Sequence, residues 1–99
     1  MFFLGIGTYK GLFSNGNLEG VGRFDYQNGS IYDGDWRENK KHGRGRLIEA
    51  DGRSIYNGEW EHDLKHGRGT FIQKGTYIIE GIWNKGSLIE MTKFQNYTI

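Results

Sequence analysis

The chain of 99 residues carries 13 lysines and arginines against 12 aspartates and glutamates, so its formal net charge is only +1. This balance excludes strong electrostatic attraction to nucleic acid, and the absence of cysteine excludes disulfides, thiolate metal sites and cysteine nucleophiles. With 15% aromatic residues, 17 glycines and no proline, the sequence predicts a single domain over residues 1–99 whose apolar surface consists mainly of rings.

Residues 1–4 are apolar but lack the basic start and the apolar core of about 7–15 residues that a signal peptide needs. No apolar run approaches the roughly 20 residues that a membrane-spanning helix requires. We therefore expect a cytoplasmic protein without a signal peptide or a transmembrane segment.

A phrase with tyrosine, glycine and an aromatic residue at alternate positions begins at Tyr9 and returns at Tyr32 and Tyr56, with Ile79 replacing tyrosine in the last copy. In each of the first three copies, a Gly-x-Gly sequence follows the aromatic residue at the same distance. A unit that repeats every 23 or 24 residues buries its apolar side by stacking on its neighbours. The predicted repeats are residues 9–31, 32–55 and 56–78, followed by a degenerate capping repeat at 79–94.

Alternation of polar and large apolar residues predicts two β-strands in each repeat and no helix. In the second repeat, a loop over residues 37–42 would close a hairpin in which Trp36 faces Gly43. A turn at residues 51–52 would then place Gly43 opposite Trp60 as well. The pattern predicts an all-β fold, a single-layer antiparallel sheet of tandem hairpins with about eight strands.

This register aligns glycines from successive strands in one row, which ends at Thr92 where a further glycine would belong. A glycine inside a strand costs roughly 0.5–1 kcal/mol relative to alanine, so a whole row of glycines must serve a purpose. We infer that aromatic rings lie flat on the bare backbone of this row. Because a single-layer sheet cannot bury every ring, we also expect an open, curved aromatic trough on this side.

The second and third copies closely resemble MORN (membrane occupation and recognition nexus) repeats. They read Tyr-x-Gly-x-Trp-x6-Gly-x-Gly from Tyr32 and from Tyr56, with His-Gly at positions 42–43 and 66–67. The resemblance covers about residues 9–94 and weakens in the last copy. It implies an elongated, twisted single sheet of hairpins without catalytic activity, and roles in scaffolds, cytoskeletal and ciliary assemblies, and junctions between membranes and proteins.

The residues that could carry chemistry are not arranged for catalysis. The Gly-x-Gly pairs lie within predicted strands, without a following helix or a Gly-Lys-Ser/Thr sequence, so they are not phosphate-binding loops. His42 and His66 are expected about 10 Å apart along the sheet, which is too far for a shared metal ion. The sequence therefore predicts no enzyme activity, no cofactor and no metal site.

Two binding functions remain open. In the first, the chain is a structural adaptor and a small subunit of a larger assembly, whose trough takes a helix or an extended segment of a protein partner. Its predicted protein-binding residues are Tyr32, Trp36, Leu47, Tyr56, Trp60 and Phe71. In the alternative, the hairpin-loop edge attaches weakly to anionic phospholipids. Its predicted lipid-binding residues are Lys40, Lys41, His42, Lys65 and His66.

Overall fold

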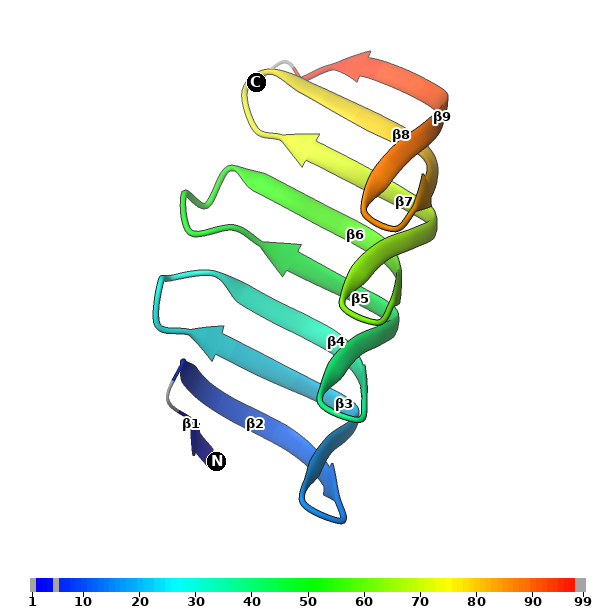
Figure 1. Cartoon of the computed structure of the whole chain (residues 1–99). Coiled ribbons are helices and arrows are strands. Elements are labelled where there is room, and N and C mark those ends of the chain that lie inside the picture. The colour runs from blue at the N-terminus through cyan, green and yellow to red at the C-terminus, as the bar shows by residue number, and fades with distance from the viewer. Residues whose placement is uncertain (1, 5, 98–99) are drawn as a thin grey trace.

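The protein forms one open antiparallel sheet in which every strand pairs with the next strand of the chain (Figure 1). The computed structural model describes residues 2–4, as backbone, and 6–97, and no helix occurs among them. The strands are β1 (Phe2–Leu4), β2 (Gly7–Ser14), β3 (Asn17–Tyr26), β4 (Ile31–Arg37), β5 (Lys40–Ile48), β6 (Ser54–Glu61), β7 (Leu64–Gln73), β8 (Tyr77–Asn84) and β9 (Ser87–Asn96). The predicted all-β, single-layer sheet is confirmed; the short β1 adds one strand to the expected eight.

The predicted register holds at the centre of the sheet. Leu47 pairs with Tyr56, and Gly43 pairs with Trp60, across β5 and β6. Glycines pair with glycines on successive strands and form a continuous row. The members of this glycine row are Gly11, Gly22, Gly34, Gly45, Gly58, Gly69 and Gly81.

The predicted pairing of Trp36 with Gly43 is wrong. Trp36 pairs with Lys41 instead, and the hairpin closes through a two-residue turn, Glu38 and Asn39, both of which have positive φ angles of 50° and 69°. Such a turn matches the right-handed twist of the strands it joins. Of the residues 37–42 expected in a loop, residue 37 therefore belongs to β4 and residues 40–42 to β5. Strand β5 bulges at Gly43, where φ is 70° and glycine avoids backbone strain.

The last hairpin also departs from the predicted register. Gly81 pairs with Met91, whereas Thr92 lies in a bulge and donates a hydrogen bond from its hydroxyl to the Glu80 carbonyl at 3.1 Å. Thr92 is therefore not the end of the glycine row. All ten residues of β9 are exposed, and its bulges disturb the flat edge that would favour pairing with another strand.

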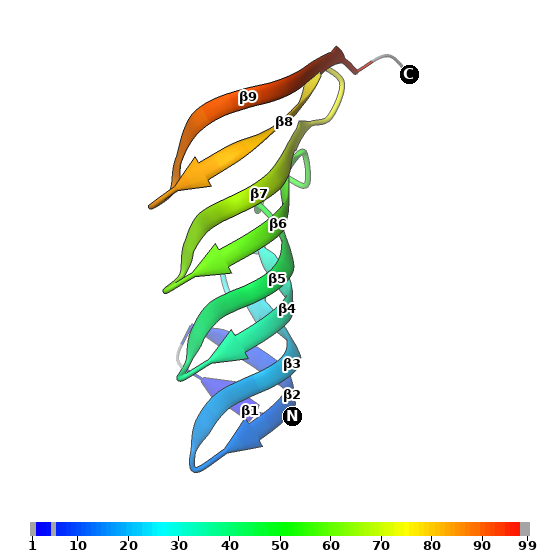
Figure 2. The ribbon, with the colours of Figure 1, turned by 90° about the vertical axis from the view of Figure 1, so that its right-hand side faces the viewer.

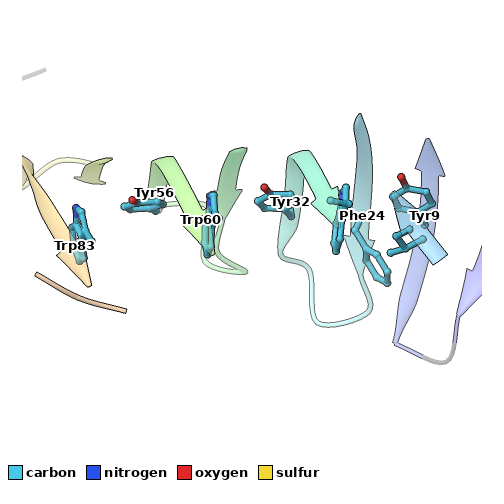
Figure 3. Packing of buried hydrophobic residues seen from close by; sticks show 8 residues of the cluster. Tyr9, Phe24, Tyr32, Tyr56, Trp60 and Trp83 are labelled. Atoms are coloured by element: carbon cyan, nitrogen blue, oxygen red, sulfur yellow. The ribbon is translucent and has the colours of Figure 1, made fainter. Parts of the chain in front are cut away.

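The sheet is curled across its strands (Figure 2), and the contacts of Lys41 show that the rings lie on the concave side. Lys41 lies beside a hairpin turn, yet its Nζ is 5.6 Å from the ring of Tyr26, which ends β3 on the far side. We call this concave side the aromatic face and the opposite side the charged face. Buried residues on the aromatic face form the core (Figure 3): Tyr9, Leu18, Phe24, Tyr32, Trp36, Tyr56, Trp60 and Trp83.

Candidate partner-binding face

The tyrosines of the repeats occupy the space above the glycine row. The Tyr32 hydroxyl donates a hydrogen bond to the Asp35 carbonyl at 3.0 Å. In this position its ring covers the backbone of Gly45, where an added Cβ would collide with the ring and the hydroxyl. The same arrangement recurs for Tyr9 over Gly22 and for Tyr56 over Gly69. The inferred purpose of the glycine row, room for rings on bare backbone, is thus met by the tyrosines.

The tryptophans lock these tyrosines in place. Each indole N–H donates to a carbonyl of the glycine row: Trp36 to Gly22 at 3.0 Å, Trp60 to Gly45 at 3.0 Å and Trp83 to Gly69 at 3.3 Å. Tyr32 lies between two indoles, with centroid distances of 4.9 Å to Trp36 and 5.4 Å to Trp60, both edge to face. Figure 3 shows this alternation of tyrosine and tryptophan along the sheet. Buried polar atoms of the rings are therefore satisfied without a partner.

The expected open trough is wrong, because the curled sheet buries its own rings. Tyr32 is 0% exposed, Tyr56 1%, Trp60 4% and Trp36 5%. Of the six predicted protein-binding residues, only Leu47 and Phe71 are half-buried. Alanine at the four buried positions would therefore test folding and not binding. The sequence pattern therefore identifies the core of the sheet and not an open surface.

Two of the predicted lipid-binding lysines also point into the aromatic face. The Nζ of Lys41 lies 5.5–5.7 Å from the rings of Tyr26, Tyr32 and Trp60 and 3.7 Å from an oxygen of Asp63. Burial lowers the pKa of Lys41, against the opposing influence of the Asp63 charge. The Nζ of Lys65 lies over the rings of Tyr56, Phe71 and Trp83. Each lysine thus takes part in a cation–π contact that holds it away from the hairpin edge.

The other three predicted lipid-binding residues do not form a basic cluster. Lys40 is exposed beside the turn, and the ring of His42 lies 6.3 Å from that of His62. His66 lies 3.2 Å from a carboxylate oxygen of Glu61, which offsets its charge when it is protonated. In the described part of the chain, no group of three or more histidine, cysteine or carboxylate residues could hold a metal ion.

Comparison with known families agrees with this geometry. The family model of the MORN repeat matches residues 9–31, 32–52 and 56–77. The chain belongs to the MORN repeat family. MORN repeats are non-catalytic modules that generally bind proteins or membranes. A search of curated proteins found no match, and no helix among the described residues is long and apolar enough to cross a membrane. The capping role of residues 79–94, which the family match does not cover, stays a prediction.

The MORN sheet leaves apolar surface open at both ends of its aromatic face. Near the N-terminus, a hollow of about 530 Å³ is lined by Ile6, Leu18, Phe24, Tyr26 and Trp36, among others. Ile6 is 62% exposed at this hollow. Near the C-terminus, the exposed apolar side chains are Leu88, Met91 and Phe94. The repeat pattern does not predict this hollow, because Tyr26 and Ile6 lie outside the repeat phrase.

The buried tyrosines predict that the MORN sheet loses stability in alkali. Burial raises the pKa of Tyr26 and of Tyr56 to about 12, and it raises that of Tyr32 as well. In the unfolded chain a tyrosine ionises near pH 10. Stabilisation by the neutral phenols is therefore complete below about pH 10 and is lost as pH rises towards about 12, where the folded state binds more protons than the unfolded state.

Urea unfolding at a series of pH values checks this prediction. The free energy of unfolding should be nearly constant between about pH 8 and 9 and should fall steadily above about pH 10. Tyrosinate absorbance should rise together with unfolding. A free energy that stays constant up to about pH 11 would contradict the prediction.

Proposed function

We propose that this MORN chain is a non-catalytic adaptor that binds a protein partner along its aromatic face, as a small subunit of a larger assembly. The observation that carries the proposal is the exposed apolar surface at both ends of that face. Ile6 is 62% exposed, Met91 54% and Phe94 51%. Apolar side chains gathered on one face of a small domain are typical of interaction sites. A cytoskeletal or ciliary setting for this assembly rests on the family resemblance alone.

The rigid core beneath this surface favours tight binding. Phe94 stacks on Tyr77 with a centroid distance of 5.9 Å, and Tyr77 in turn contacts Phe71 at 6.3 Å. These rings are linked to the interlocked core through Trp83, whose centroid lies 6.5 Å from that of Phe71. A surface that is already ordered loses little conformational entropy when a partner binds. A helix or an extended segment of a protein can lie along the concave face.

Aspartate at Phe94 tests the proposal, because it places a charge in the open apolar surface without touching the buried core. Quantitative affinity purification from native cells should recover the protein partner with the parent chain and at least tenfold less of it with Phe94→Asp. Val21→Asp is the matched control, since Val21 is 59% exposed and pairs with Asp35 on the charged face. It should change recovery less than threefold.

The outcome that overturns the proposal is the reverse pattern, with partner retained by Phe94→Asp and lost from Val21→Asp. Circular dichroism of both variants shows whether the sheet is intact. The membrane alternative would instead be supported if the parent chain bound vesicles of anionic phospholipid at physiological salt and Lys40→Glu bound them more than tenfold more weakly. We favour the protein partner because Lys41 and Lys65 face the rings and not the hairpin edge.

A further inference from the structure

Successive hairpin turns are linked by one repeated hydrogen bond. The second residue of a turn donates its backbone N–H to a carbonyl of the preceding hairpin. The pairs are Asn39 to Leu18 at 3.1 Å, Asp63 to Lys41 at 3.0 Å and Gly86 to Lys65 at 3.0 Å. All three turn residues have positive φ angles, of 69°, 70° and 88° in chain order. Residues 39, 63 and 86 are therefore structurally equivalent, as are residues 18, 41 and 65.

At the first two of these positions a side chain returns the hydrogen bond. Asn39 Oδ1 accepts from the Leu18 backbone N–H at 2.8 Å, and Asp63 Oδ1 accepts from the Lys41 backbone N–H at 2.8 Å. The same Asp63 oxygen lies 3.7 Å from Lys41 Nζ. One carboxylate thus satisfies a backbone donor and neutralises an ammonium group that sits over aromatic rings.

At the third position this carboxylate has no counterpart, because residue 86 is glycine. Lys65 is held like Lys41, with its Nζ 5.6 Å from the ring of Tyr56, 5.6 Å from that of Trp83 and 6.0 Å from that of Phe71. Among the described residues, Lys65 has no ion pair, and no side chain accepts a hydrogen bond from its backbone N–H. The backbone N–H and the ammonium group of Lys41 hold the Asp63 carboxylate. The equivalent two groups of Lys65 are present, but no carboxylate from the part of the chain that the structure describes lies between them.

We propose that the backbone N–H and the ammonium group of Lys65 form a carboxylate-binding subsite on the aromatic face. Its ligand is an aspartate or glutamate side chain of the protein partner, which takes the place that Asp63 takes at Lys41. The inference rests on the proposed function and states the chemistry of the partner. It requires a segment that carries an acidic residue together with apolar residues for the open surface near Phe94.

The position of Lys65 suits this role. Its side chain is half-buried and is fixed by three rings, so a carboxylate meets an ordered ammonium group with little water around it. Leu88, which pairs with Trp83, supplies exposed apolar surface beside it. Lys41 does not compete, because Asp63 already neutralises it. The ammonium groups of Lys41 and Lys65 thus both lie over three rings, but only that of Lys41 has a carboxylate beside it.

Gly86→Asp provides the direct test, with Gly86→Asn as the matched control. An added Cβ at Gly86 meets only the Leu64 side chain, at 3.8 Å, and Asp63 and Asn39 already adopt the same backbone conformation. Aspartate at position 86 should occupy the subsite from within the chain. Asparagine offers the same oxygen acceptor without the charge.

The first measurement uses N-acetyl-aspartate amide as a probe and N-acetyl-asparagine amide as its neutral counterpart. In amide NMR spectra of the parent chain, the Lys65 signal should shift and saturate with the aspartate probe only, and the Lys41 signal should stay in place. Gly86→Asp should abolish the Lys65 shift. Equal shifts at both lysines, or a shift that persists in Gly86→Asp, would overturn the subsite.

The second measurement uses a random peptide library displayed on phage and selected on the parent chain. Selected peptides should contain an acidic residue, bind Gly86→Asp at least tenfold more weakly, and bind Gly86→Asn more tightly than Gly86→Asp. The selection could instead yield peptides without acidic residues, which bind Gly86→Asp as well as the parent chain but do not bind Phe94→Asp. This result would overturn the subsite and support the proposed function. Binding of the aspartate probe, with no peptide selected at the aromatic face, would support the subsite and overturn the proposed function.

Discussion

Replacing Gly45 by valine is expected to lower the free energy of unfolding by at least about 2 kcal/mol. A Cβ at this position would collide with the hydroxyl and the ring of Tyr32, which is 0% exposed. Tyr32 cannot move aside, because its ring lies between Trp36 and Trp60 and its hydroxyl bonds the Asp35 carbonyl. Urea unfolding of the variant and the parent measures the difference.

The neighbouring Arg46 offers a matched control for this substitution. It is exposed on the charged face of the same strand, so Arg46→Val should change stability by less than about 0.5 kcal/mol. A double-mutant cycle identifies the cause: Gly45→Ala should cost much less in a Tyr32→Ala background than in the parent chain. Equal costs of Gly45→Ala in both backgrounds would show that the ring does not occupy the space above the glycine.

The glycine row was predictable because residues on paired strands obey a strict period of two. A turn predicted at residues 51–52 implies the pairing of Leu47 with Tyr56, and the period of two then aligns the glycines of successive strands. The actual connection between β5 and β6 is longer, but it preserves this pairing. The same period of two predicted that the rings share one face of the sheet. It could not tell whether the rings would be open or covered, since burial depends on how strongly the sheet curls, and strand periodicity carries no information on curvature.

The hairpin ends were mispredicted for a physical reason that one residue illustrates. Gly43 pairs with Trp60 as expected, but it also adopts a φ of 70° and forms a bulge in β5. The bulge lets Lys41 pair with Trp36 and turns its side chain over the rings. A glycine that serves a bulge and a glycine that makes room for a ring look alike in a sequence. The inward lysines and the Asp63 carboxylate therefore emerged only from the structure.

The interlocked rings also determine how stability is distributed along the sheet. Trp60 on β6 donates its indole N–H to Gly45 on β5 and packs against Tyr32 on β4 at 5.4 Å. It also contacts Tyr56 at 5.0 Å and lies 5.5 Å from Lys41 Nζ. In a repeat protein each unit contacts only its neighbours, so the loss of one central contact separates the units on either side.

Trp60→Ala is accordingly expected to cost about 3–5 kcal/mol and to uncouple the two halves of the sheet. Trp83→Ala removes an equivalent ring near the C-terminal end and should cost less, since Trp83 is 8% exposed and its N–H bond to Gly69 is longer, at 3.3 Å. Hydrogen exchange should show β7 to β9 opening together in Trp60→Ala while β2 to β5 stay more protected. If the two alanine variants lost equal stability and exchanged uniformly, the central tryptophan would not be the link between the repeats.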